Sequence, residues 1–224
     1  MKRTMKIITK ASGAFALVGL VYLLLLAHPE PLFSCSVTYS EITFYSHSPL
    51  SPQVADIASA VEKRLSTSEL CDPALNQKVF VVDRPWLWNL LNGPYRHAVA
   101  RNVELGNPIL VPRLDINARQ ITQFDGRRAG AVNVLTHEAV HTLVRRRIGL
   151  FRLWRLQWWQ KEGYAEYVAS AAATRSEAPL RYQQAAVAWK YLLERRHLRF
   201  DQIIELNDSL SQILSHLEDM HGGG

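Results

Sequence analysis

Cysteine is scarce in this chain. Only Cys35 and Cys71 occur among 224 residues. No short Cys-x-x-Cys spacing is present, which argues against a metal site built by this pair. In an oxidising compartment the simplest expectation is one disulfide between Cys35 and Cys71, and the alternative is two separate buried thiols.

Internal repeats and long low-complexity tracts are also absent. Hydrophobic residues make up 48% of the chain and charged residues 21%, a composition that excludes a disordered or collagen-like protein. The length suits one ordinary domain with a proper core.

Acidic residues are missing from the start of the chain, where the first is Glu30. The formal net charge is +6, and the N-terminal tail supplies four of those charges, so the remainder carries about +2 (6 − 4). No DNA- or RNA-binding motif surrounds the one later basic cluster, so no nucleic-acid partner is expected. That cluster is either a solvated helix end or a surface facing anionic lipid. The tail residues are Lys2, Arg3, Lys6 and Lys10, and the cluster contains Arg145, Arg146, Arg147, Arg152 and Arg155.

An uncharged apolar run extends from Ala11 to Ala27. Its length is near the minimum for a membrane span, and the basic flank predicts that residues 1–10 stay in the cytoplasm. We therefore expect a single-pass signal anchor at 11–27, a tether at 28–36 and an extracytoplasmic domain at 37–224, periplasmic or extracellular. A cleaved signal and lipidation at Cys35 are the alternatives.

The pattern that follows predicts an α+β domain with a mixed sheet of a few strands. Residues 37–46 and 78–83 are rich in apolar and β-branched side chains and predict strands, and the helical spacing over 52–68 predicts a helix between them. Residues 107–115 predict a strand at the edge of the sheet, because Pro108 and Pro112 each remove a backbone donor.

From residue 129 onward the apolar spacing is helical. It predicts a helix that ends near Gly149, a second over 158–173, and two more over about 179–197 and 200–217.

The first of these helices carries the sequence HEAVH at 137–141. His137 and His141 are one turn apart, so both imidazoles leave the same face and can hold one zinc ion. Glu138 projects about 100° away from His137, toward a metal-bound water rather than the metal. A site with two histidines still needs a third protein ligand.

That ligand can come from the next helix. Twenty residues separate His141 from Glu162, enough for the first helix to end and a second to return. Glu166 lies one turn beyond Glu162 on the same face.

The two motifs together resemble the gluzincin metallopeptidases, and most closely their small minigluzincin or peptidase-MA-like branch. The resemblance rests on residues 133–169. Its matching residues are His137, Glu138, His141, Trp159, Glu162, Gly163, Ala165, Glu166 and Tyr167.

The resemblance implies a zincin-like fold in which His137, His141 and Glu162 bind Zn²⁺. The spacing of twenty residues is slightly longer than in larger relatives, which leaves Glu166 as an alternative third ligand. Otherwise Glu166 would hold the free nitrogen of a ligand histidine in the correct tautomer. Gly163 would allow the two helices to approach closely.

The implied reaction is hydrolysis of a peptide bond by metal-activated water, with Glu138 as general base. Tyr182, Tyr191 and Tyr164 are candidate donors to the oxyanion, or ordinary half-buried aromatic residues. The tryptophans can pack in the core, line a groove or lie at a membrane surface. A noncatalytic envelope binding or scaffold protein of the same fold is the alternative to a peptidase.

Overall fold

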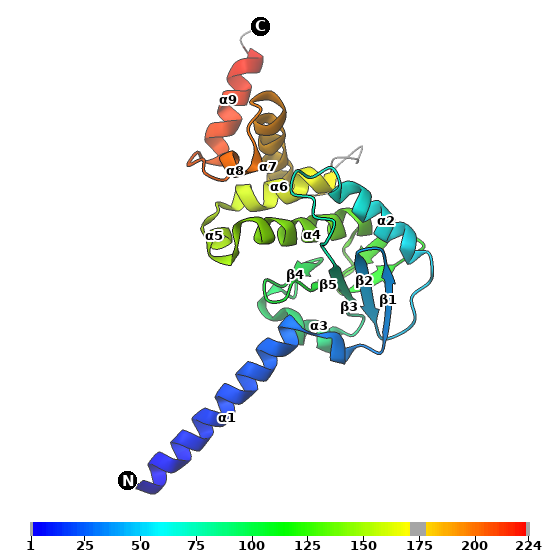
Figure 1. Ribbon diagram of the computed structural model, residues 1–224, viewed down its shortest axis with the longest axis vertical. Coiled ribbons are helices and arrows are strands. Elements are labelled where there is room, and N and C mark those ends of the chain that lie inside the picture. Colours follow the sequence, from blue (N-terminus) through cyan, green and yellow to red (C-terminus); the bar gives the residue numbers. More distant parts are fainter. Residues whose placement is uncertain (1, 171–177, 223–224) are drawn as a thin grey trace.

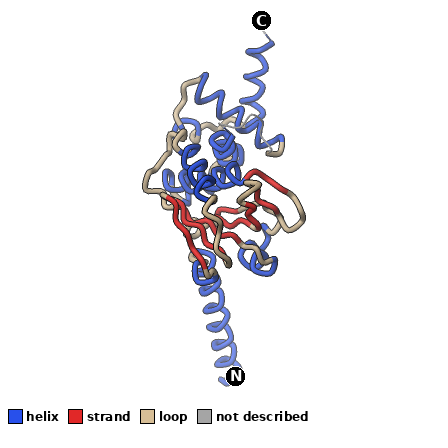
Figure 2. The backbone as a smooth tube through the Cα atoms, turned by 90° about the vertical axis from the view of Figure 1, so that its right-hand side faces the viewer, coloured by secondary structure: helices blue, strands red, loops and turns tan. Residues whose placement is uncertain are grey.

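The computed structural model of the chain describes residues 2–170 and 178–222, and the side chains of residues 15–170 and 178–218. The fold is α+β with a mixed sheet, as the sequence predicts (Figure 1). Strands occupy one layer and most of the helices another (Figure 2).

The main sheet has five strands in the order β1-β2-β3-β5-β4. β2 and β3, and also β3 and β5, pair in parallel, and the two outer pairs are antiparallel. The bounds are Cys35–Tyr39 for β1, Ile42–Ser46 for β2, Gln77–Val81 for β3, Ile109–Val111 for β5 and Arg101–Asn102 for β4.

A smaller antiparallel sheet follows, in the order β6-β7-β8. Its strands are Arg113–Asp115, Gln120–Thr122 and Arg128–Gly130. The sequence did not predict this second sheet. Each of its strands has only three residues, too few to show the alternating pattern of a strand.

Two faces of the main sheet bury two separate cores, because successive side chains of a strand point to opposite sides. In β3, Val79 and Val81 join the larger core, while Phe80 belongs to the smaller one. β5 divides in the same way, with Leu110 in the smaller core.

The larger core lies between the sheet and helices α2, Val54–Leu65, and α4, Ala131–Ile148. The smaller core lies between the sheet and α3, Pro85–Asn92. α2 confirms the helix expected from the spacing, and the apolar residues of that spacing are all buried: Val54, Ile57, Ala58, Val61 and Leu65.

Further helices cover α4 on the side away from the sheet. α5, Leu150–Arg155, turns the chain, and α6, Trp158–Ser170, packs on α4. α7, Leu180–Lys190, packs on α6 and continues as a π-helical turn, Tyr191–Arg195. α8, Phe200–Ile203, and α9, Leu210–Gly222, complete this layer. Residues 171–173 of the expected second helix lie outside the described residues.

The helix α1, Lys2–Ala27, extends away from the domain (Figure 1). Over the described part of the chain, none of the helices has both the length and the apolar character needed to span a bilayer. Residues 28–36, expected to form a tether, include a 3-10 turn at Glu30–Leu32 and the first residues of β1.

Three predicted elements are wrong in detail. The single strand expected at 37–46 is a hairpin, which turns at Ser40 with φ 49°. The single helix expected at 200–217 is divided into α8 and α9 by residues 204–209, a segment that contains Asn207 and Asp208, residues favoured in turns.

The third correction concerns the edge strand. β5, within the expected strand 107–115, is internal, because β3 and β4 pair with its two sides. Pro108 and Pro112 flank the three paired residues rather than interrupt them, so no donor within the strand is lost. The edge is β4, which has only two residues.

The expected disulfide is not formed, and both cysteines are free thiols. Cys35 pairs with Ser46 at one end of the β1–β2 hairpin. Cys71 lies on the segment that leads to Gln77, and Gln77 pairs with Ile42 at the opposite end of β2. The strand direction therefore places the two thiols toward different ends of the sheet.

Candidate metal centre

α4 presents both histidines of the first motif on one face. The ring centroids of His137 and His141 lie 5.0 Å apart with an interplanar angle of 79°. This is the separation expected for side chains one helical turn apart. The opposite side of α4 is buried in the larger core through residues such as Leu135, Ala139 and Leu143, which fixes the direction in which the histidines point.

The chain then reverses to bring a carboxylate to the same place. α4 ends at Gly149, whose φ of 79° is accessible to glycine at little cost. α6 is anchored beyond the turn by Gln160, whose side-chain amide donates to the carbonyls of Ile203 and Leu206. Glu162 then faces α4.

The three side chains converge on one point. Nε2 of His137 lies 3.1 Å from Oε2 of Glu162, and Nε2 of His141 lies 3.5 Å from the same oxygen. One ligand atom from each residue lies within 4.8 Å of the others. Tetrahedral ligands about 2.0–2.1 Å from a zinc ion are roughly 3.3 Å apart. The group His137, His141 and Glu162 can therefore hold a metal ion, because its ligand atoms already have a spacing close to that of ligands around one ion.

The side chains of this group strongly shift one another's pKa values. Burial alone would lower the pKa of His137, but the hydrogen bonds to Glu162 and Glu166 outweigh it and raise the pKa to about 10. Burial alone would raise the pKa of Glu162, but hydrogen bonds from His137 and His141 hold it far below its ordinary value. The carboxylate therefore stabilises a positive charge between itself and the histidines, and a bound cation can supply that charge in place of a proton.

Glu166 lies behind His137 rather than at the point of convergence. Its Oε2 is 3.5 Å from Nδ1 of His137, while Nε2 of the same ring faces Glu162. A carboxylate at the second nitrogen fixes which nitrogen carries the proton and which is free to ligate. This position suits a supporting carboxylate, and Glu162 has the position suited to the third ligand.

Glu138 contacts the edge strand of the main sheet. The backbone N–H of Asn102 donates to Oε2 of Glu138 at 2.7 Å. The side-chain amide of Asn102 donates to the Glu138 carbonyl at 3.0 Å and to Oγ1 of Thr142 at 2.8 Å. Thr142 in turn donates to Gln77 of β3 at 3.0 Å. A polar chain thus connects α4 to the sheet and orients Glu138.

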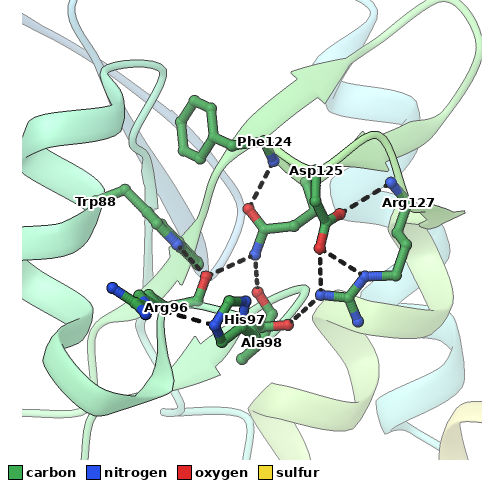
Figure 3. A network of polar contacts seen from close by, with 8 residues as sticks. Trp88, Arg96, His97, Ala98, Phe124, Asp125 and Arg127 are labelled. Carbon is green, nitrogen blue, oxygen red and sulfur yellow. Dashed lines mark hydrogen bonds and ion pairs between the residues drawn. The ribbon is translucent and has the colours of Figure 1, made fainter.

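The segment that leads into β4 is held by a second polar network (Figure 3). The amide of Gln123 donates to the carbonyls of Arg96 and Ala98, and the indole of Trp88 donates to the Arg96 carbonyl at 2.9 Å. Arg127 donates to the His97 carbonyl and pairs with Asp125. The turn between β7 and β8 therefore fixes the approach to the edge strand beside Glu138.

The three candidate tyrosines have different surroundings. The ring of Tyr182 lies 6.0 Å from that of His137 and packs edge-on against Trp158. Tyr164 is buried with its hydroxyl 2.8 Å from Oγ of Ser68, and Tyr191 is buried in the larger core. Among the candidates, Tyr182 is the one with a contact to a metal-binding candidate. Burial and the nearby Glu162 raise its pKa, so it remains a proton donor at neutral pH.

Other residues singled out in the sequence take structural positions. Gly163 lies against α7 rather than α4, because a Cβ atom there would meet Trp189 and the Ala185 carbonyl. Trp88 and Trp159 are buried, whereas Trp86 and Trp154 are exposed. Three arginines of the basic cluster pair with acids elsewhere in the chain: Arg146 with Asp72 in the connection between α2 and β3, Arg147 with Asp201 of α8, and Arg152 with Glu205 just after α8.

The sequence did not indicate the polar residues that support the site, which are Asn102, Thr142, Gln77 and Gln123. They are single polar residues in short or apolar segments, and no spacing connects them in the sequence.

No known protein family, curated protein or solved structure matches this chain in comparisons of sequence and fold.

Proposed function

We propose that the chain is a membrane-anchored zinc peptidase that hydrolyses peptide bonds outside the cytoplasm. The observation that carries this proposal is the convergence of His137, His141 and Glu162 within 4.8 Å, with Glu138 beside them on α4. Two imidazoles and one carboxylate are the ligand set of hydrolytic zinc sites that keep the fourth position open for water, and a further glutamate beside them can act as general base. The resemblance of the two motifs to the gluzincins supports the same activity.

The chain's own residues can carry the proton transfers. A zinc ion, when bound, would polarise the substrate carbonyl and lower the pKa of water toward about 7. Glu138 accepts a proton from the attacking water as the new carbon–oxygen bond forms. It then returns that proton to the amine nitrogen as the carbon–nitrogen bond breaks. Tyr182 is the nearest candidate to donate to the developing oxyanion.

Anchoring is supported by the order of charge along the first helix. Four basic residues precede the uncharged run at 11–27, and positive charge on that flank favours its retention in the cytoplasm. The domain that carries His137 then lies on the other side of the membrane.

One observation favours the alternative of a noncatalytic binding or scaffold protein. The outward backbone N–H of Asn102 and one oxygen of Glu138 are already bonded to each other at 2.7 Å. A peptide that extended the sheet at β4 would need that N–H. In a peptidase this bond must open or be shared when substrate binds.

Replacement of Glu138 by Gln separates the two functions. In the full chain purified in detergent, we expect Glu138→Gln to bind zinc as the wild type does but to cleave a peptide library about 10²–10⁴-fold more slowly. Metal content is measured by elemental analysis and cleavage by mass spectrometry. His137→Ala should lose both the metal and the activity.

The matched control is Glu41→Gln, which neutralises an exposed glutamate in the β1–β2 turn. It should retain wild-type zinc content and rate. Equal cleavage by wild type and Glu138→Gln would refute the proposed mechanism, and zinc bound without any cleavage by the wild type would favour the noncatalytic alternative.

A further inference from the structure

α3 exposes apolar side chains on the side away from the sheet. Trp86 and Leu90, one turn apart, are 60% and 44% exposed, and Leu105 in the loop after β4 is 43% exposed. The other apolar residues of α3, Leu87, Trp88 and Leu91, are buried in the smaller core. We refer to Trp86, Leu90 and Leu105 as the α3 face.

The α3 face adjoins the end of α1. The hydroxyl of Tyr22 donates to the carbonyl of Leu90 at 2.8 Å. Gly106, next to Leu105, is so close to α1 that a Cβ atom there would collide with the Ala27 carbonyl. Leu26 packs against the smaller core. α1 therefore leaves the domain directly beside this face (Figure 1).

The position of Tyr22 defines the depth of α3 if α1 spans a bilayer. Tyr22 precedes Ala27, the end of the apolar run, by five residues, which is about 7.5 Å along a helix axis. Helices that lie in a membrane surface bury their apolar side by about 5–10 Å. A helix bonded to Tyr22 is thus at the depth of the interfacial layer.

The charge of the surrounding segment fits the same environment. Asp83 and Glu104 bound a stretch, residues 84–103, that contains Arg84, Arg96 and Arg101 and no acidic residue. Arg84 and Arg96 are exposed on either side of α3. Tryptophan concentrates at membrane interfaces, and arginine is attracted to anionic headgroups.

We propose that the α3 face rests in the interfacial layer of the same bilayer that α1 spans. This inference rests on the membrane anchoring that belongs to the proposed function. The candidate centre is then held close to the membrane surface. Only four residues separate Gly106, beside α1, from Asn102, a distance of at most about 14 Å along the chain. Asn102 in turn donates a hydrogen bond to Glu138. The substrates of the centre are accordingly polypeptide segments that lie next to the membrane.

Lipid contact is tested by quenching of tryptophan fluorescence in the full chain, reconstituted into vesicles that contain lipids brominated near the headgroup end of the acyl chain. We expect these lipids to quench the wild type and most of that quenching to be lost in Trp86→Phe. The matched control, Trp158→Phe, replaces a tryptophan of α6 that packs on Tyr182, and it should retain the quenching.

Flotation of the vesicles separates this inference from the proposed anchoring. A chain that does not float with the vesicles refutes both. A chain that floats but is quenched equally with and without Trp86 refutes only the docking of the α3 face. Blue-shifted Trp86 emission without lipid quenching would also overturn it, because a second protein copy would then cover the face.

The substrate class is tested in the same vesicles. We expect a peptide anchored by a membrane helix to be cleaved faster than the same peptide in solution, and Leu90→Gln to reduce that preference while the rate on the soluble peptide is retained. Equal rates on both peptides for the wild type would overturn the substrate class. Cleavage of neither peptide would instead contradict the peptidase activity itself.

Discussion

At the scale of single residues, His137 links the candidate metal centre to stability. Its pKa in the folded metal-free protein is raised to about 10, above the value of about 6.5 for a free histidine. Folding therefore favours the protonated ring. The resulting stabilisation is complete below about pH 6.5 and is lost as the pH rises toward 10.

We expect the free energy of unfolding of the chelator-treated protein to decrease between about pH 7 and pH 10, by up to about 1.4 kcal/mol per pH unit. Denaturant titrations at several pH values measure it. The decrease should be smaller in His137→Ala and unchanged in His216→Ala, which alters an exposed histidine of α9. The same decrease in all three proteins would contradict the prediction.

A second prediction at this scale concerns Glu166. Its carboxylate lies 3.5 Å from Nδ1 of His137, so Glu166→Gln removes the charge that orients the ring. We expect zinc affinity to decrease about tenfold, measured by competition with a coloured chelator. Glu194→Gln, at an exposed position near Tyr167, should bind zinc as the wild type does. A larger loss, comparable to that of His141→Ala, would instead indicate that Glu166 is a ligand.

At the scale of elements, the site depends on close packing of α6 between α4 and α7. Glu162 faces α4, while Gly163 faces α7, where Trp189 donates to the carbonyls of Trp159 and Gln160 at 3.3 Å and 3.1 Å. One helix thus presents a ligand on one side and a packing surface on the other. We therefore expect a change in the α6–α7 contact to displace Glu162.

Gly163→Ala tests this connection. The added Cβ would lie 2.6 Å from Cδ1 of Trp189 and 2.8 Å from the Ala185 carbonyl, so α6 and α7 must separate. We expect a destabilisation of about 1–3 kcal/mol in thermal or denaturant unfolding, together with weaker zinc binding. Unchanged stability would show that the two helices adapt without cost.

At the scale of the whole molecule, the smaller core joins α1 to the domain. Phe33 packs with ring centroids 5.2 Å from Phe80 and 5.0 Å from His47. Glu30 forms an ion pair with Lys78 of β3 at 2.5 Å. The segment after α1 is therefore packed on the sheet, and the orientation of α1 is coupled to that of the domain.

We expect Phe33→Ala to destabilise the full chain by roughly 2 kcal/mol, because it removes a partly buried ring from the smaller core. Chemical unfolding in detergent measures the change. Leu23→Ala, which shortens a side chain of α1 that is 49% exposed, should leave the domain's stability within about 0.5 kcal/mol of the wild type. A similar loss in both variants would show that the effect does not arise from the smaller core.

Local spacing explains why much of the candidate centre could be predicted from the sequence. The four-residue separation of His137 and His141 places both rings on one face in any α-helix. Gly149 similarly marks the end of α4, and the apolar positions of α2 identify its buried side. These features depend on neighbours along the chain.

The order of strands depended instead on partners distant in sequence. Proline at 108 and 112 suggested an edge, yet pairing on both sides makes β5 internal and leaves the two-residue β4 at the edge. The contact of Asn102 with Glu138 follows from that order. Strand pairing is determined by long-range packing more than by local preference, so no spacing in the sequence indicates it.

The sequence by itself determined which residues can ligate a metal, because an α-helix converts a four-residue separation into a shared face. Only the tertiary structure decided that Glu162 rather than Glu166 lies at the point of convergence, and that Glu138 meets the edge strand. These outcomes require the relative placement of α4, α6 and the sheet, which is set by the packing of side chains far apart in the chain.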